Sequence, residues 1–411
     1  MADQAPPTVP DARPGDRRAL VVMTVAHGIQ HFYVAGLALT YPFVVADLHV
    51  SYAVLGAVLT VAGVAGGLLQ GAAGILGRAR ARVVLGTQNA GLAVASLAGA
   101  LAPGFGLFAG ARVLGALVSW PQHPVGSAYL SDRFPRRRAT VLSWHTAGGS
   151  IGTVTVPLVV TAVIAVAGWR WALVALTGAL ALGALLVGAA LPSEHHADAE
   201  LAAGGERPSL RALVRTPGVG VALAASTIAA GGRGLGTLST YVPADLRSGL
   251  RLPALTVGAV FTVVMAASVA GPVVGGSLAD RFGRKRTLVA TYYAAAAAVC
   301  AFGFAGPNLA ALVPLGLLMG FLAYTESPLL QALFSDLVGP GRSRSAFGIF
   351  FAVAYGVGAL WTALLGWIIT VAGFPAAFAT MAGSFVVAGS VIALGLRGPQ
   401  AGGVTMEVPA R

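Results

Sequence analysis

The feature that most constrains this chain is a succession of long apolar runs with only short polar breaks between them. Residues 172–191 read ALVALTGALALGALLVGAAL, and residues 21–45 contain no acidic residue, lysine or arginine. An α-helix needs about 20 mostly apolar residues to cross the hydrocarbon core of a bilayer. With 56% hydrophobic and 10% charged residues, the 411-residue chain lacks the polar surface that a soluble protein of this length requires. The sequence therefore predicts an all-α polytopic membrane protein.

Breaks at glycine, proline and charged residues divide the chain into twelve apolar segments. We place these segments at residues 19–45, 51–75, 83–102, 105–131, 139–168, 170–191, 217–242, 254–278, 286–305, 308–337, 344–372 and 375–396. The longest hydrophilic connection, residues 192–216, lies near the middle and predicts a linker between two bundles of six helices. The expected organisation is a tail at 1–18, a bundle at 19–191, the linker at 192–216, a bundle at 217–396 and a tail at 397–411.

The basic residues collect at alternate breaks between these segments. One set of loops and tails holds 21 of the 26 lysines and arginines, the alternate set holds 3, and Arg112 and Arg233 fall inside apolar segments. Basic residues favour the cytoplasmic side of a membrane. We therefore expect the tails and the linker to be cytoplasmic, in a bacterial inner membrane. The net charge of +12 does not indicate nucleic-acid binding, because the bases sit in short clusters between apolar runs.

Two stretches in corresponding places indicate an internal repeat. HPVGSAYLSDRFPRRR at 123–138 matches SPLLQALFSDLVGPGR at 327–342 in a proline, an alanine, a Ser-Asp pair and a final arginine. Both stretches follow the fourth segment of their half. Two halves in the same order, both starting on the same side, predict a parallel repeat.

A dense charge cluster, GGSLADRFGRKRT at 275–287, separates the eighth and ninth segments. It resembles the G-x-L-x-D-R-x-G-R-[RK] loop signature of the major facilitator superfamily. The residues that carry the match in this loop are Gly276, Leu278, Asp280, Arg281, Gly283, Arg284 and Lys285. The resemblance implies twelve helices in two parallel repeats and transport by alternating access. It also implies that Asp280 engages a neighbouring helix end and the loop arginines, and so latches one conformation. The first-half copy keeps Gly77 and Arg78, but Gly74 stands where the acid belongs.

Further motifs point to a narrower group. The spacing of Arg112 and Gly115 is similar to a pattern of proton-coupled carriers, and GGSIGTVTVP at 148–157 resembles a glycine-rich motif of exporters, with Val156 in place of a glycine. His27 and His31 followed by Tyr-Pro, the His123-Pro pair and the glycine-rich run look like the fosmidomycin-resistance group of drug exporters. That group has an acid at the position of His31, which leaves substrate and coupling open.

Ionisable side chains inside apolar segments are the candidate site, because a charge at mid-bilayer costs at least ~2.5–3.5 kcal/mol and usually faces a cavity. The candidates for substrate binding or proton coupling are His27, Gln30, His31, Arg112, His123, His145, Arg233 and Glu326. His27 and His31 share one helix face because they are four residues apart, and histidine exchanges protons near neutral pH. With neutral histidines the cavity carries a charge of about +1, which favours an anionic or zwitterionic substrate.

Structural roles remain open for the same residues. Each histidine could serve as a hydrogen-bond partner between helices, and Arg112 or Glu326 could belong to a buried structural pair. His27 and His31 resemble two metal ligands, but a metal site needs a third ligand or water, so no metal is predicted.

Two local distortions are expected around these residues. Pro121 and Pro124 should distort the fourth segment near His123. Four glycines around Arg233 indicate a loosened seventh helix.

The leading hypothesis for function is proton-coupled export of a small polar or drug-like molecule. Its partners would be that molecule, protons and the lipid bilayer. An importer of a small organic anion is the alternative within carriers, and a membrane sensor or assembly factor on a carrier scaffold is the alternative outside them. Since the sequence contains no G-x-x-x-x-G-K-[ST] loop, ATP is not expected to drive transport directly. No catalytic grouping indicates an enzyme, and no cofactor is expected.

Overall fold

The computed structural model describes residues 15–72, 81–134, 137–192, 213–339 and 343–396, and this part of the chain contains helices and no strand. The first half comprises α1 (Asp16–Asp47), α2 (Tyr52–Ala72), α3 (Ala81–Ala100), α4 (Phe105–Val118), α5 (Gln122–Arg133), α6 (Arg138–Ala167) and α7 (Trp169–Ala190). The second half comprises α9 (Val219–Ala229), η1 (Gly234–Leu238), α10 (Ser239–Ala244), η2 (Asp245–Gly249), α11 (Ala254–Phe282), α12 (Arg284–Gly303), α13 (Leu309–Ala323), α14 (Glu326–Val338), α15 (Ser343–Phe351), η3 (Ala352–Val357) and α16 (Leu360–Gly395).

These pieces make twelve membrane-crossing segments, which confirms the predicted fold class. Four of the crossings are built from more than one helix: α4 continues into α5, α9 into η2 and α13 into α14, while α15 and η3 run into α16. The long α16 holds the last part of the eleventh crossing and all of the twelfth, because Gly373 adopts a left-handed backbone (φ 82°) that turns the chain. The tails and most of the expected linker, residues 1–14, 193–212 and 397–411, lie outside the described residues.

The break in the fourth crossing lies where the sequence predicts it, near Pro121. The fourth crossing stops being helical at Ser119 and resumes at Gln122, after Pro121. The tenth crossing breaks at Tyr324 and Thr325, which is the equivalent position when the two halves are aligned on their matching prolines. A shared break at the same place in both halves supports the internal repeat.

The seventh crossing differs from the continuous segment 217–242 that the apolar run suggested. Its α-helix ends at Ala229, Arg233 has an extended backbone (φ −61°, ψ 131°), and Gly236 has a φ of 161°. The glycines around Arg233 destabilise the α-helix here, since glycine is among the poorest helix formers. The helix then resumes and runs to Gly249, beyond the predicted end, through the π-helical segment η2.

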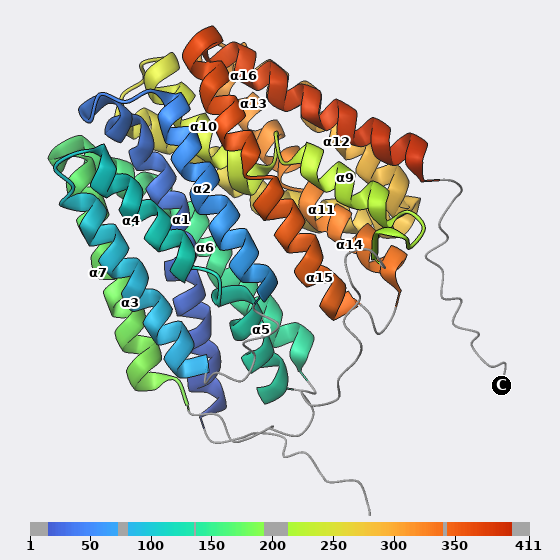
Figure 1. Ribbon diagram of the computed structural model, residues 1–411, viewed down its shortest axis with the longest axis horizontal. Helices are drawn as coiled ribbons and strands as arrows, with labels where there is room; N and C mark the ends of the chain where they lie inside the picture. Colours follow the sequence, from blue (N-terminus) through green and yellow to red (C-terminus); the bar gives the residue numbers. More distant parts are fainter. Residues whose placement is uncertain (1–14, 73–80, 135–136, 193–212, 340–342, 397–411) are drawn as a thin grey trace, which may run out of the picture.

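The helices form two bundles, α1–α7 and α9–α16, which converge at the end of the molecule that carries Asp47 (Figure 1). Hydrogen bonds join them there. Thr60 Oγ1 lies 2.8 Å from Thr362 Oγ1, and the Ala53 amide donates to Thr370 Oγ1 over 3.0 Å. Glycine makes the approach possible, because a Cβ on Gly56 would lie 2.3 Å from the Thr362 carbonyl oxygen. The contact end of the two bundles is therefore closely packed.

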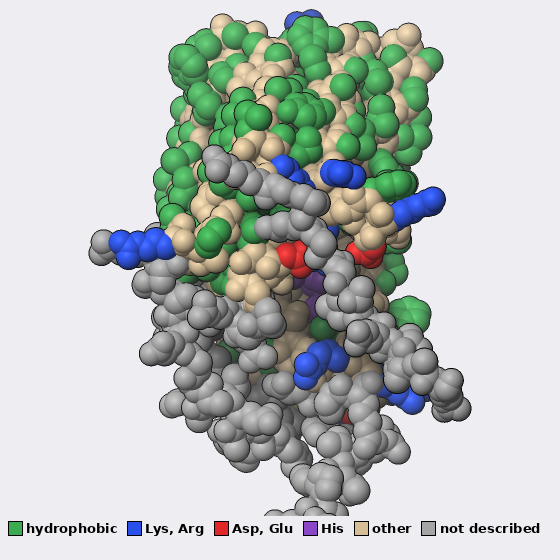
Figure 2. All heavy atoms as spheres, turned by 90° about the vertical axis from the view of Figure 1, so that its right-hand side faces the viewer, with side chains coloured by type: hydrophobic (Ala, Val, Ile, Leu, Met, Phe, Trp, Pro, Cys, Tyr) green, Lys and Arg blue, Asp and Glu red, His purple; other side chains and the backbone are tan. Residues whose placement is uncertain are grey.

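At the opposite end the bundles diverge (Figure 1). Figure 2 shows a hollow between them in which histidine side chains are visible, with arginine and lysine side chains around it. The described basic residues at this end include Arg133, Arg138 and Arg284. The structure is thus closed at one end and open at the base-rich end.

Candidate functional site

Four histidines from three helices of the first bundle meet at the hollow. His27 and His31 lie on α1, His123 on α5 and His145 on α6. The ring centroid of His27 is 4.5 Å from that of His31, 5.2 Å from that of His123 and 4.0 Å from that of His145. The His31 and His123 rings are 5.7 Å apart. The structure therefore brings together all four histidines that the sequence singled out, and we call them the histidine cluster.

The glycine-rich run on α6 makes room for this cluster. A Cβ on Gly148 would lie 2.2 Å from the Thr24 carbonyl oxygen, and one on Gly152 would lie 2.1 Å from the Gly28 carbonyl oxygen, so both glycines bring α6 against α1. A Cβ on Gly149 would lie 2.9 Å from His27 Cε1 and 3.1 Å from His31 Cδ2. The motif that resembles an exporter signature thus has a local role, because it lets two imidazole rings lie between the helices.

Hydrogen bonds fix how two of the rings are oriented. His27 Nδ1 lies 2.7 Å from the His145 carbonyl oxygen, which can only accept, so this nitrogen carries the proton. His31 Nδ1 lies 3.1 Å from Thr153 Oγ1, whose own hydroxyl donates to the Gly149 carbonyl over 3.0 Å. Because that hydroxyl proton is committed, Thr153 accepts from His31 Nδ1. The Nε2 atoms of His27 and His31 are consequently lone-pair acceptors when the rings are neutral.

Exposure rises across the cluster toward the hollow. His27 is 4% exposed, His31 is partly exposed and His123 is exposed. His27 Nε2 is buried and has no hydrogen-bond partner among the described residues, and the same holds for Gln30 Oε1. Buried polar atoms are nearly always satisfied. These atoms therefore mark a place where a bound species can supply the missing partner.

Arg112 lies deeper in the same bundle and faces tyrosine hydroxyls. The guanidinium interacts with the hydroxyls of Tyr33 and Tyr41 on α1, and its Nε has no hydrogen-bond partner among the described residues. Among those residues no carboxylate forms an ion pair with it. Gly115 leaves space for the arrangement, since a Cβ there would lie 3.1 Å from Tyr33 Oη and 3.3 Å from Arg112 Nη1.

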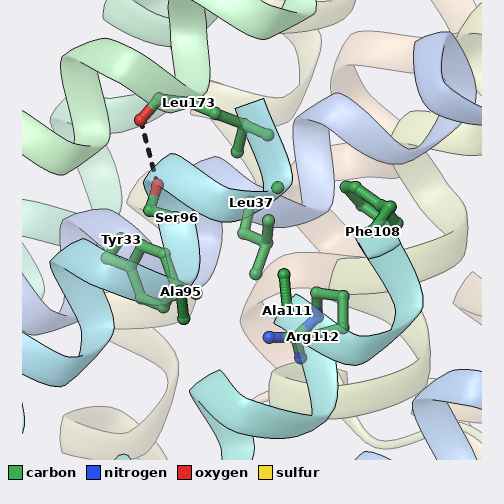
Figure 3. A pocket seen from close by; sticks show the side chains of 9 residues that line it. Tyr33, Leu37, Ala95, Ser96, Phe108, Ala111, Arg112 and Leu173 are labelled. Carbon is green, nitrogen blue, oxygen red and sulfur yellow. Dashed lines mark hydrogen bonds between the residues drawn. The ribbon is translucent and has the colours of Figure 1, made fainter. Parts of the chain in front are cut away.

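Arg112 also lines a small cavity with residues from neighbouring helices (Figure 3). The space of about 10 Å³ is lined by Tyr33, Leu37, Ser96, Phe108 and Leu173 among others. Ser96 donates its hydroxyl to the Leu173 carbonyl at 2.9 Å across this region. Such a volume is roughly the space of one water molecule, so this cavity does not hold a larger ligand in the present conformation.

Arg233 and Glu326 form a separate buried pair in the second bundle. Arg233 Nε donates to Glu326 Oε1 at 3.0 Å, and the two side chains are 6% and 0% exposed. The other guanidinium nitrogens donate to the Ala354 carbonyl at 3.0 Å and the Ser226 carbonyl at 2.8 Å. Tyr292 donates its hydroxyl to the second carboxylate oxygen at 3.2 Å. The extended backbone at Arg233 sits in the middle of this network, so the pair holds the broken seventh crossing against α14 and η3.

The charged residues of the loop after α11 have different surroundings. Gly283 adopts φ 90° between α11 and α12, which is the turn that the loop motif requires. Arg284 pairs with Asp336 at the end of α14, and Lys285 donates to the Ala393 carbonyl at 2.9 Å and to the Leu396 carbonyl at the end of α16. Arg281 and Asp280 are exposed, and among the described residues Asp280 has no ion-pair partner. The latching role of Asp280 stays a prediction.

Sequence reasoning missed the residues that orient the cluster. Thr153 fixes His31, while Tyr33 and Tyr41 face Arg112. The two tyrosines are eight residues apart on α1, which places them near one face of the helix. Thr153 lies within the glycine-rich run at 148–157, four residues after Gly149. This position is the sequence signal that could have identified it.

Comparisons with known proteins agree with this architecture. The family model described as Major Facilitator Superfamily matches residues 23–244 and, in a second match, residues 222–407. A solved structure of the nucleoside transporter NupG is similar with a TM-score of 0.76 at 14% identity, covering 91% of this chain and 98% of that one.

Two further solved structures have the same fold. A D-xylose-proton symporter gives a TM-score of 0.70 at 16% identity, with 93% and 98% of the two chains covered. The human organic anion transporter MFSD10 (TETRAN) gives 0.62 at 16% identity, with 92% and 100% covered. No curated protein matches the sequence. At such low identities these likenesses show the fold alone.

Proposed function

This chain belongs to the major facilitator superfamily, a family of membrane transporters, and we propose that it exports a small polar or drug-like molecule in exchange for protons. The observation that carries the proposal is the histidine cluster, which lies at the hollow between the two bundles. In carriers built from repeats, substrate and coupling ions bind near mid-membrane between the repeats, and the bundles rock around that site. The position of the cluster at the hollow supports assigning it to this role.

The charge distribution supports an opening toward the cytoplasm. The hollow lies at the base-rich end, and basic residues favour the cytoplasmic side. With this orientation both tails are cytoplasmic, and the protein resides in a bacterial inner membrane. A cytoplasm-facing opening is the conformation in which an exporter loads its substrate.

The histidines suit the coupling step for a chemical reason. Histidine exchanges protons near neutral pH, and the exposed His123 ring gives protons in the hollow a route to the more buried His31 and His27. Protonating neighbouring rings places like charges a few ångströms apart, which disfavours binding of a cationic group of the substrate at the same place. Competition between proton and substrate for one cluster is what exchange requires.

Import of a small organic anion is the second candidate, and Arg112 favours it. A partly buried guanidinium without an ion-paired carboxylate among the described residues is a potential anion partner. Arg233 is less suited to this role in the present conformation, because each of its guanidinium nitrogens already has a partner. Substrate binding by Arg233 and Glu326 remains a prediction for other conformations of the cycle.

The test is a drug-susceptibility panel, with fosmidomycin included, in an efflux-deficient bacterium that expresses the wild type or His123→Ala. We expect resistance to at least one compound, lost when the proton gradient is collapsed and lost in the variant. His49→Asn is the matched control, because His49 is exposed at the other end of the molecule. If the membrane-inserted wild type still protects the cells after the proton gradient is collapsed, proton coupling is contradicted. Greater sensitivity to an anionic toxin would instead support import.

A further inference from the structure

We propose that His27, His31 and His123 bind a divalent transition-metal ion such as Zn²⁺. This inference goes beyond the transport function and does not depend on it. The sequence offered two ligands on one helix face and therefore predicts no metal. The structure supplies the missing third ligand from α5, where the break after Pro121 brings His123 to the other two rings.

The distances fit a single ion after a small adjustment. One ligand nitrogen from each of the three rings lies within 4.8 Å of the others. Zinc–nitrogen bonds are about 2.0–2.1 Å, so nitrogens sharing a tetrahedral ion are about 3.3 Å apart and their ring centroids roughly 5 Å. The observed centroid separations of 4.5, 5.2 and 5.7 Å lie around that value. The two larger separations both involve the exposed His123 ring, whose rotation about its side-chain bonds would bring it closer to the other two.

Two of the rings already have the outer hydrogen bonds typical of metal ligands. A metal-binding histidine usually donates its other ring N–H to a carbonyl or another acceptor, which fixes the tautomer and orients the lone pair. His27 donates to the His145 carbonyl and His31 donates to Thr153. Both rings are therefore held with Nε2 free to coordinate.

The burial of His27 supplies an independent argument. Its Nε2 is buried without a hydrogen-bond partner among the described residues, in a side chain only 4% exposed. Such an atom is costly unless a partner satisfies it. A bound cation at the centre of the three rings would satisfy this lone pair.

The chemistry of the ligands selects the class of ion. Neutral imidazoles suit Zn²⁺, Cu²⁺ and Ni²⁺, whereas Mg²⁺ and Ca²⁺ prefer oxygen ligands. His145 stacks on His27 with an interplanar angle of 11°, so its ring packs beside the site rather than completing it. Three protein ligands leave a fourth position, which can hold water or a donor atom of a bound molecule.

The experiment is a Zn²⁺ titration by calorimetry on the purified full-length protein, with an affinity tag that contains no histidine. His195→Ala and His196→Ala form the background, because these two histidines lie in the linker and could bind the ion themselves. Co²⁺ is the spectroscopic probe, since a tetrahedral site gives much stronger visible absorption than an octahedral one. We expect one ion per chain and a tetrahedral spectrum.

Three variants decide the outcome. We expect His123→Ala to lower Zn²⁺ affinity at least tenfold. Thr153→Val removes the acceptor for His31, together with the hydroxyl's own bond to the Gly149 carbonyl, and should lower the affinity about 10–100-fold. His49→Asn should bind as the background protein does. The proposal is overturned if the background protein binds no ion, or if either His123→Ala or Thr153→Val retains full affinity. Because the assay measures binding alone, these results are independent of whether drug export is found.

Discussion

The two bundles differ in whether their buried ionisable side chains have partners. In the second bundle, the Arg233–Glu326 pair is fully hydrogen-bonded through Ser226, Ala354 and Tyr292. In the first bundle, His27 Nε2 and Arg112 Nε are buried without partners among the described residues. Buried polar networks that are complete specify a structure, whereas incomplete ones are costly unless something binds. We infer that the second bundle provides a fixed support and the first bundle contacts substrate and ions.

The backbone also differs between the two bundles, at the crossings that begin them. The seventh crossing loses helical geometry around Arg233, and the pair compensates by tying Arg233 to α9, α14 and η3. The corresponding first crossing, α1, stays helical from Asp16 to Asp47 and holds His27 and His31 on one face. Polar side chains in the second bundle thus replace missing helix hydrogen bonds, while those in the first bundle are left for other partners.

The largest effect should come from breaking the pair in the second bundle. Glu326→Gln leaves the Arg233 guanidinium buried without a counter-charge, and losing one partner of a buried ion pair costs about 3–5 kcal/mol. We expect a large fall in the melting temperature of the solubilised protein and poor recovery of monodisperse material. Size-exclusion chromatography after heating measures both.

A double variant separates charge from shape. Arg233→Met combined with Glu326→Leu removes both charges and keeps apolar volume, so it should recover part of the lost stability. If Glu326→Gln alone melts at the wild-type temperature, the pair is not the support that we infer.

A second test removes the charge of Arg112 in the first bundle. Arg112→Met takes away a charge that has no ion-paired carboxylate among the described residues, so the melting temperature should stay the same or rise. Transport of an anionic substrate should fall about tenfold or more, which matches the loss of a hydrogen bond to a charged group worth roughly 1.5–3 kcal/mol. Uptake or efflux of a labelled substrate, normalised to protein in the membrane, measures the effect. A variant that melts early but transports normally would reverse the two roles.

A smaller loss is expected from crowding the histidine cluster. A Cβ on Gly149 would lie 2.9 Å from His27 Cε1, so Gly149→Ala should push the rings apart at a cost of about 1–3 kcal/mol. Gly178→Ala on α7 is the matched control, because nothing lies within 4 Å of its Cβ position. We expect a lower melting temperature and weaker transport for the first variant only, measured in the same assays. Equal behaviour of the two variants would show that the rings adapt without cost.

The sequence predicted the crossings well because each needs only a sufficient apolar run, and lipid imposes that requirement at every crossing. Breaks at Pro121 and around Arg233 were predicted for the same local reasons. The grouping of four histidines was not, since α1, α5 and α6 meet through glycine contacts that depend on the three-dimensional packing. A structural pair that includes Glu326 was weighed as an alternative, but its partner was not identified, because Arg233 lies 93 residues away along the chain. Only packing reveals that Arg112 lacks the same kind of partner.

The smallest effect on stability is expected at the base-rich end, where two acids differ in their surroundings. Asp336 pairs with Arg284, and both side chains are more than a third exposed, so Asp336→Asn should cost no more than about 1 kcal/mol. Asp280 has no ion-pair partner among the described residues, and Asp280→Asn should leave the melting temperature unchanged.

Asp280 should nevertheless affect the transport cycle if it latches the opposite conformation, in which the bundles close at this end. Its removal would then favour the open state seen here. Labelling of His123→Cys by a thiol reagent reports the opening, in a Cys300→Ser background that removes the native thiol. We expect faster labelling with Asp280→Asn than without it, and no such change with Asp336→Asn. Equal rates in all three proteins would limit Asp280 to setting topology, and would leave the closing of this end to contacts between the helices themselves.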